Sequence, residues 1–195
     1  MKQLFDLLDA IRPLSPELKT YLLSMLISME FKRKDIILQS GQTANRIYFI
    51  EKGLVRSVRF EKGRERTAWF MKEGDVMLSV ESFFNQTPAL ETIEALEDCL
   101  FHSISREQLY IAYERYPEFN FHRAVILEKY YPQSEARARM RQLNASEKFE
   151  HLMNTQPDLV TRVTDKMLAS FLGVTPGTYS YQKGIFANRD RKRLK

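Results

Sequence analysis

The sequence has a single cysteine, Cys99, among its 195 residues. One thiol excludes a disulfide within the chain and cannot by itself hold an iron–sulfur cluster, so we expect Cys99 to pack in a core. No apolar run approaches the roughly eighteen residues that cross a bilayer. The amino-terminal segment MKQLFDLLDAIRP has two acidic residues in an amphipathic pattern, unlike a signal peptide. The sequence therefore predicts a cytoplasmic protein with no membrane partner.

Histidine is also scarce, and its distribution argues against an enzyme. The three histidines, His102, His122 and His151, fall in one expected strand and two expected helices, and no His-x-His pattern occurs. Metal-dependent barrel enzymes need histidine and carboxylate ligands clustered on adjacent strands. The sequence also lacks a glycine-rich phosphate loop and a nucleophile elbow. We therefore expect neither catalysis nor a cofactor nor a metal.

Hydrophobic residues make up 44% of the chain, which is ample for a packed core, and their pattern changes along the sequence. Apolar spacing predicts helices over 4–11 and 15–28. From Phe31 to Ile104 the chain has short runs rich in Ile, Val, Phe and Tyr, separated by turn glycines. Such runs predict the strands of a β-barrel or sandwich. The sequence Glu61-Lys62-Gly63-Arg64 is the clearest hairpin tip.

Helical patterns return after this β-rich segment. The pattern predicts a helix over 106–116 and a long helix over 118–143, within which Pro132 is expected to kink or interrupt the helix. The aromatic residues and arginines of the long helix suit packing against both its own barrel and a second subunit, so we expect a homodimer. A further helix is expected from Ser146 to Thr155.

The segment LASFLGVTPGTYSYQK at 168–183 predicts two short helices joined by a tight turn. Thr164 or Asp165 can cap the first helix, and Gly173 allows the positive φ of the turn. Thr175-Pro176 is a strong start for a second helix, expected to run to about Phe186. This arrangement is typical of a DNA-binding helix-turn-helix. Its candidate contacts to double-stranded DNA are Thr175, Gly177, Thr178, Ser180, Tyr181, Lys183, Arg189 and Arg191.

The basic end of the chain strengthens this interpretation. Residues 183–195 hold six cations against Asp190, a net charge of +5, which equals the formal charge of the whole chain. Lys and Arg at this density attract a polyanion through counterion release. An ordinary helical hairpin with a solvated tail remains the simpler alternative.

The run KRKDIILQSGQTANRIYFIEKGLVRSV, with a Gly-Asp pair downstream, resembles the cyclic-nucleotide-binding β-roll of the CRP/FNR family of bacterial transcription regulators. The resemblance covers nearly the whole chain. It implies an α+β fold with a jelly-roll sensor domain at 1–117, a dimerisation helix at 118–143 and a helix-turn-helix domain at 144–195 without a complete wing. It also implies a homodimeric, effector-responsive regulator of transcription.

The expected ligand pocket departs from the family pattern. Members that bind cyclic AMP carry a glycine-flanked Glu and then Arg-Ser or Arg-Thr, whereas this chain reads SVESFFNQTPALETIEA. Glu81 and Ser82 stand near the sugar-binding position, and Glu91-Thr92 replaces the phosphate-binding arginine pair. Because a carboxylate repels a phosphate, we do not expect cyclic AMP to bind. An unidentified small-molecule effector, or none, remains open.

The expected DNA-reading helix departs as well. The family usually places a Glu and an Arg where this chain has Gly177 and Tyr181, so the two side chains that read base edges are missing. A non-DNA-binding adaptor with an altered helix-turn-helix is therefore the alternative function. Steep weakening of DNA binding with salt would distinguish the regulator from the adaptor.

Overall fold

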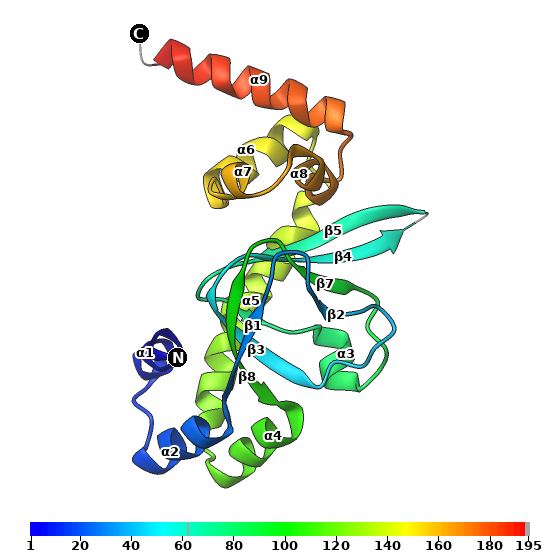
Figure 1. Cartoon of the computed structure of the whole chain (residues 1–195). Coiled ribbons are helices and arrows are strands. Elements are labelled where there is room, and N and C mark those ends of the chain that lie inside the picture. Colours follow the sequence, from blue (N-terminus) through cyan, green and yellow to red (C-terminus); the bar gives the residue numbers. More distant parts are fainter. Residues whose placement is uncertain (62, 194–195) are drawn as a thin grey trace. The chain divides into compact units, whose positions relative to one another are not determined.

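The structure is a computed structural model that describes residues 1–61 and 63–193, except for the side chains of 189–193. Figure 1 shows its helices and strands in chain order by colour, and labels all of them except β6. The chain divides into two compact units. The first unit comprises Met1–Arg59 and Trp69–Lys129, and the second comprises Phe60–Ala68 and Tyr130–Lys195. The predicted division at 117/118 and 143/144 stays a prediction.

The first unit is built on two antiparallel sheets, as the sequence predicts. One sheet has the order β1-β8-β3-β6 and the other β2-β7-β4-β5. The strands are β1 (Ile27–Phe31), β2 (Ile36–Leu38), β3 (Arg46–Lys52), β4 (Val55–Glu61), β5 (Arg64–Met71), β6 (Val76–Met77), β7 (Thr92–Ala95) and β8 (Cys99–Ser105). The turn between β4 and β5 falls at the predicted hairpin tip, where Gly63 has a φ of 73°. The α+β class and the β-roll are thereby confirmed.

The core of the roll lies between the two sheets. Ile50 of β3 and Phe101 of β8 pack against Val55 of β4 and Ile93 of β7 in one cluster. Gly53 has a φ of 104°, and a Cβ at this position would lie 2.5 Å from Cys99 Sγ, so only glycine fits this turn. Cys99 is buried in this core, as expected, and burial raises its pKa to about 11.

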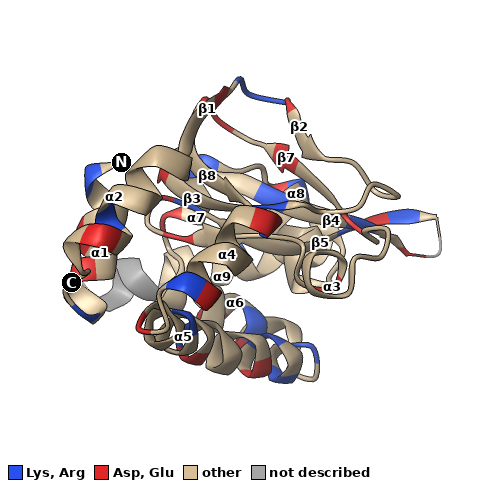
Figure 2. Cartoon of the chain, turned by 90° about the horizontal axis from the view of Figure 1, so that it is seen from below, with Lys and Arg blue, Asp and Glu red and all other residues tan. Residues whose placement is uncertain are grey.

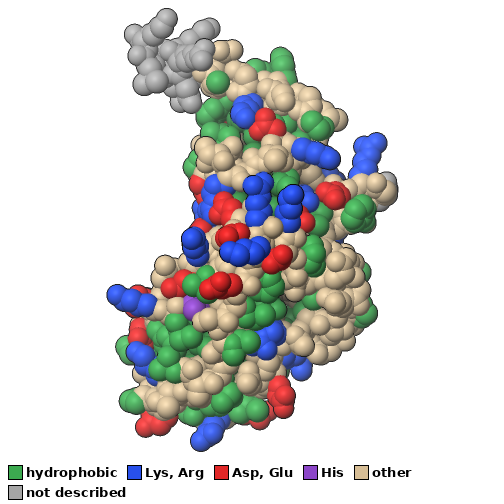
Figure 3. Space-filling view, viewed as in Figure 1, with side chains coloured by type: hydrophobic (Ala, Val, Ile, Leu, Met, Phe, Trp, Pro, Cys, Tyr) green, Lys and Arg blue, Asp and Glu red, His purple; other side chains and the backbone are tan. Residues whose placement is uncertain are grey.

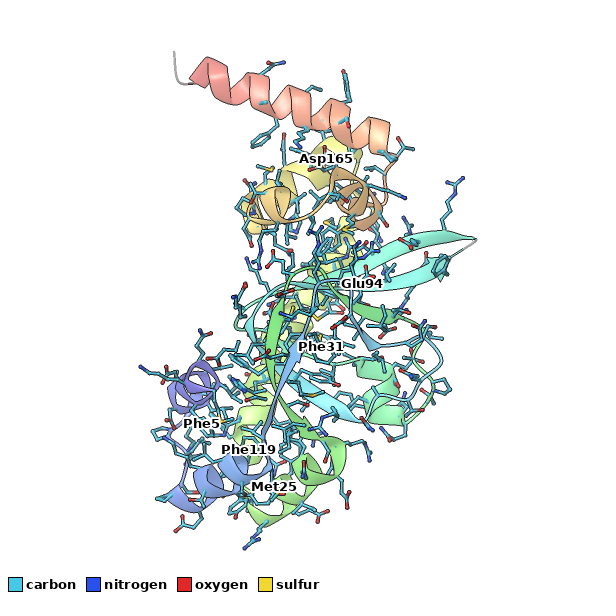
Figure 4. The ribbon with its side chains drawn as sticks, viewed as in Figure 1. Phe5, Met25, Phe31, Glu94, Phe119 and Asp165 are labelled. Carbon is cyan, nitrogen blue, oxygen red and sulfur yellow. The ribbon has the colours of Figure 1, made fainter. Side chains whose placement is uncertain are left out.

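A second cluster joins the helices of the first unit to the roll. These helices are α1 (Lys2–Ile11), α2 (Pro16–Met25), α3 (Val80–Asn85) and α4 (Arg106–Arg115). Phe5 of α1 and Phe119 of α5 belong to this cluster and are labelled in Figure 4. Helix α2 ends three residues before the predicted position because the chain enters β1 at Ile27.

Helix α5 (Phe119–Met140) runs through Pro132 without a break, so the expected interruption is wrong, whereas the expected kink stays a prediction. Proline removes one helical hydrogen bond and crowds the carbonyl four residues earlier. Pro132 is exposed, however, so water can satisfy the freed carbonyl. Cations and anions both occur along this helix (Figure 2).

The second unit is helical apart from the tip of the β4–β5 hairpin. It contains α6 (Ala145–Thr155), α7 (Leu159–Arg162), α8 (Asp165–Leu172) and α9 (Pro176–Arg193). Phe149 of α6 contacts Tyr179 and Phe186 of α9, with ring centroids 5.4 Å and 5.6 Å apart. Helix α9 continues past the predicted end at Phe186, because these contacts and the turns beyond them outweigh the cost of Gly184, about 1 kcal/mol.

Arg137 holds the hairpin tip to the helices of the second unit. Its guanidinium donates to the carbonyls of Thr67 and Ala68 on β5 and, over 2.6 Å, to the carbonyl of Phe171 on α8. It also stacks on the Phe171 ring, 3.7 Å from the centroid. Burial lowers the pKa of Arg137 to about 10. Ser170 of α8 completes the contact by accepting from the Thr67 N–H.

Within the described part of the chain, no helix combines the length and the apolar character needed to span a membrane. On the face drawn in Figure 3, hydrophobic side chains are interspersed with charged ones. The described residues contain no group of three or more histidine, cysteine or carboxylate side chains arranged to hold a metal.

Candidate functional site

A cavity of about 400 Å³ opens inside the first unit, between strands of both sheets. This volume lies toward the lower end of the range for small-molecule sites. Six of the eleven residues that line it are polar: Gln42, Thr43, Asn45, Arg46, Tyr48 and Ser79. The other five are apolar: Ile37, Leu38, Ala44, Leu78 and Ile93. The cavity is therefore suited to an amphipathic small molecule.

Arg46 and Tyr48 stand two residues apart on β3, so their side chains lie on the same face of the strand. Tyr48 is paired in register with Ser103 of β8. Arg46 donates from Nε to Ser103 Oγ over 2.7 Å and from Nη2 to the Ser103 carbonyl over 3.3 Å. These bonds fix the guanidinium against the cavity wall.

The four residues that the sequence analysis placed in a ligand pocket are not among those that line this cavity. Glu81 is exposed in the first turn of α3. Ser82 is buried, accepts from the Ala44 N–H and donates to the Thr87 carbonyl, so it fixes a loop. Thr92 accepts from the Ser40 N–H and supports the neighbouring turn.

Glu91 is buried behind the cavity wall and is neutralised there. Its Oε1 accepts from Ser79 Oγ over 2.6 Å, and its Oε2 accepts from Arg59 Nη2 over 2.9 Å. A neighbouring pair on these strands, Arg56 with Glu94, is also an ion pair. The carboxylate at the expected phosphate position is therefore part of an internal pair and leaves no unpaired cation there.

The turn between α8 and α9 has the geometry that the sequence predicts. Thr164 caps α8 by accepting from the Met167 N–H, and Gly173 ends α8 with a φ of 67°. Thr175 then accepts from the Thr178 N–H at the start of α9, whose first residue is Pro176. A residue with a Cβ at 173 would be strained by this φ and would lie 2.8 Å from Arg66 Nη1.

The predicted DNA contacts on α9 differ in how accessible they are. Gly177, Ser180 and Tyr181 are exposed, Tyr181 to 68%. Thr175 and Thr178 are engaged with each other, because their hydroxyl oxygens lie 2.8 Å apart. From 176 to 188 the one charged side chain is that of Lys183, which is 44% exposed and paired with Asp165. This part of the helix therefore offers no unpaired charge.

Lys183 is occupied within the second unit. Its Nζ donates to both carboxylate oxygens of Asp165 at the start of α8, over 2.9 Å and 3.1 Å. Asp165 is labelled in Figure 4 below the first turns of α9. The predicted contacts Arg189 and Arg191 have side chains outside the described part of the structure.

Sequence reasoning missed two arginines, Arg46 in the cavity and Arg137 in the second unit. The alternation Arg46-x-Tyr48 on a predicted strand was a usable signal for two polar side chains on one face. No local pattern identified Arg137, because its partners on β5 and α8 are distant in the sequence.

A comparison with known protein families finds a match, which lies in the β-rich part of the chain. A model of the cyclic nucleotide-binding domain matches residues 28–116. These residues are therefore similar to a cyclic nucleotide-binding domain. The comparison with curated proteins found no significant match to the chain.

Solved structures show the same fold over most of the chain. FixK2 from Bradyrhizobium japonicum superposes with a TM-score of 0.72 and 17% identity, covering 85% of this chain and 86% of that chain. The c-di-GMP responsive global regulator CLP from Xanthomonas campestris has a TM-score of 0.69 and 17% identity, covering 89% and 93%. A protein of Eubacterium rectale assigned to the CRP/FNR family has a TM-score of 0.70 and 16% identity, covering 90% and 85%.

The chain is thus similar to CRP/FNR-type regulators in the cyclic nucleotide-binding domain and in the fold around it. The sequence-based resemblance to this family is confirmed. CLP and the Eubacterium rectale protein are both described as regulators.

Proposed function

We propose that the chain is a dimeric, DNA-binding regulator of transcription whose β-roll cavity receives an effector. The observation that carries the proposal is the turn between α8 and α9, where Gly173 adopts a φ of 67° and Pro176 opens a second helix with an exposed face. Two helices joined in this way let the second enter the major groove of DNA. The three parts of this function are a sensor at 1–117, a dimerisation helix at 118–143 and a DNA-binding domain at 144–195.

The dimer is supported by the exposed side of α5. Five of its exposed residues alternate at spacings of three and four, as in the seam of a coiled coil: Ala124, Leu127, Tyr131, Ser134 and Ala138. Leu127 and Tyr131 are 47% and 69% exposed. A second copy of the same helix would bury these side chains at the two-fold axis.

The DNA affinity should come mainly from phosphate contacts. Gly177 and Tyr181 cannot make the bidentate base contacts that Arg, Asn or Gln make. Lys183 is paired with Asp165, so it contributes less than a free lysine. The remaining cations of the basic end, Arg189, Arg191, Lys192, Arg193 and Lys195, are the candidates for phosphate binding.

Fluorescence anisotropy with duplex DNA over a salt series tests the proposal. The affinity of the full chain for the duplex should fall steeply as salt rises. Titration at saturating concentration should give two chains per duplex. We expect these two chains to occupy half-sites roughly 34 Å apart. Truncation after Phe186 should flatten the salt slope and weaken binding to all sequences alike. The double variant Arg189→Gln/Arg191→Gln should lower the slope by about 2, at about 0.9 per phosphate contact.

Arg33→Gln is the matched control, because Arg33 is an exposed arginine of the first unit. It should leave the salt slope unchanged. The adaptor is the second candidate function, favoured by the lack of unpaired charge on α9 from 176 to 188. If truncation leaves affinity and salt slope as they are, the basic end does not bind DNA and the adaptor becomes the better description.

A further inference from the structure

The cavity of the first unit contains one cation that is not balanced by a carboxylate. Among the described residues, Arg46 forms hydrogen bonds with Ser103 alone, through a hydroxyl and a carbonyl, and it forms no ion pair with any of them. No carboxylate is among the described residues that line the cavity. Glu91, the nearest carboxylate in the sequence-based pocket, is neutralised by Arg59 and Ser79.

Arg46 retains the part of its guanidinium that recognises a carboxylate. A guanidinium has five N–H groups, and Ser103 uses two of them, one on Nε and one on Nη2. One N–H on Nη2 and both on Nη1 remain. The end of the guanidinium can therefore donate two parallel hydrogen bonds to the two oxygens of a carboxylate.

Tyr48 supplies a second donor beside Arg46. Its hydroxyl makes no hydrogen bond to any residue in the described part of the chain, although the side chain is half-buried and lines the cavity. Burial raises the pKa of Tyr48, and the charge of Arg46 offsets part of this effect. The phenol therefore stays protonated at neutral pH and can donate to an anion.

The apolar residues of the wall indicate that the ligand has an apolar part. Ile37, Leu38, Leu78 and Ile93 form an apolar surface in a cavity of about 400 Å³. A small anion without an apolar part would leave this surface in contact with water. A dianion would be only half neutralised, because the wall offers a single unbalanced cation.

We propose that this cavity binds a small monocarboxylate with an apolar body, whose carboxylate is held by Arg46 and Tyr48. The inference rests on the proposed function only in treating the cavity as the effector site. The anionic group of this ligand lies on β3, and not at Glu91, where the family resemblance places the cyclic phosphate. The site is therefore a carboxylate site in a fold whose relatives include nucleotide sensors.

Calorimetry on the full chain, without DNA, tests the inference. The probes are phenylacetate and 4-methylpentanoate, each compared with its neutral amide, together with acetate, inorganic phosphate and cyclic AMP. The two apolar carboxylates should bind, and their amides should bind at least about tenfold more weakly, because a charge-assisted pair is replaced by a neutral one. Acetate, phosphate and cyclic AMP should bind more weakly than phenylacetate.

Variants assign the binding to the named residues. Arg46→Gln keeps a donor toward Ser103 and should weaken phenylacetate binding about tenfold or more. The affinity of Arg46→Lys for phenylacetate should lie between those of the parent chain and Arg46→Gln. Tyr48→Phe should weaken binding several-fold. Arg33→Gln, an exposed arginine outside the cavity, should have no effect. Protection of Cys99 from alkylation shows that each variant keeps the folded roll.

Three results would overturn the inference: no binding of either apolar carboxylate, equal binding of acid and amide, or an Arg46→Gln variant with unchanged affinity. Preferential binding of cyclic AMP through Arg46 would also overturn it. DNA binding with no carboxylate binding would leave the regulator proposal standing and remove this one. Carboxylate binding with no DNA binding would do the reverse.

Discussion

The cavity of the roll and the outer face of α9 differ in whether they keep a positive charge that no carboxylate balances. In both regions a charged group at an expected anion-binding position is turned into an internal ion pair, Glu91 with Arg59 in the roll and Lys183 with Asp165 in the helices. The cavity still keeps one unbalanced cation, Arg46. The residues of α9 from 176 to 188 keep none, because Lys183 is paired with Asp165.

The two regions depend on different parts of the chain, the helix turn on its backbone and the cavity on its side chains. The turn at Gly173 depends on φ and capping and not on the side chains at 177 and 181, so the helix hairpin keeps its geometry whatever residues stand there. The cavity depends on its side chains instead. Arg46 is partly exposed there and is held by Ser103, so its remaining N–H groups can face a ligand.

The largest expected effect is Phe149→Ala, which tests whether the two regions are separate. Phe149 is 3% exposed and contacts Tyr179 and Phe186, so its truncation leaves a cavity at the base of α9. We expect a loss of roughly 3–5 kcal/mol in the free energy of unfolding of the second unit. DNA binding should be lost, while phenylacetate binding in the roll should be retained.

Cys99 provides the measurement for the first unit. Burial raises its pKa to about 11, which keeps the thiol protonated and slow to alkylate at pH 8. Circular dichroism should show early loss of helix in Phe149→Ala, while Cys99 labelling remains as slow as in the parent chain. Simultaneous exposure of Cys99 would show that the two units unfold as one.

A smaller effect is expected from Glu91→Gln. Glutamine can still accept from Ser79, but the charge that holds Arg59 is lost, and Arg59 is already 39% exposed. We expect about 1–2 kcal/mol of destabilisation by urea unfolding. Cyclic AMP should still fail to bind, because Gln supplies no guanidinium. The control is Glu128→Gln on the exposed side of α5, which should be neutral.

Binding of cyclic AMP to Glu91→Gln with micromolar affinity would contradict this account. It would mean that the carboxylate alone excludes the nucleotide and that the cavity otherwise matches the family. The loss of nucleotide binding in the roll would then depend on Glu91 alone.

Sequence patterns located most elements because local signals and tertiary structure agree there. The turn glycines and the Thr175-Pro176 start are examples, since φ and capping are local properties. The expected interruption at Pro132 and the expected helix end at Phe186 were wrong, because an exposed proline is tolerated within α5 and the contact of Phe186 with Phe149 supports α9 beyond this residue.

The ligand site was less predictable than the fold. The expected pocket was placed by resemblance on Glu81, which the structure exposes in the first turn of α3. The cavity wall instead combines β3 with residues that follow β6 and lie in β7, so its composition depends on strand order. Pairings such as Tyr48 with Ser103 cannot be read from either strand alone.

The smallest effect, and the finest test of the comparison, is Lys183→Gln. The pair with Asp165 is 44% exposed on both sides, so it should contribute at most about 1 kcal/mol to stability. A free lysine at a phosphate would add about 0.9 to the salt slope of DNA binding. Because Asp165 already neutralises Lys183, we expect Lys183→Gln to lower the slope by clearly less than that. Asp165→Asn should raise the affinity modestly by releasing the lysine, and Lys2→Gln, an exposed lysine in α1, should change neither quantity. A loss of slope in Lys183→Gln as large as that caused by removing the basic end would show that DNA displaces Asp165. The outer face of α9 would then have a cation that can bind phosphate. The cavity and α9 would no longer differ in having a cation available to an anion.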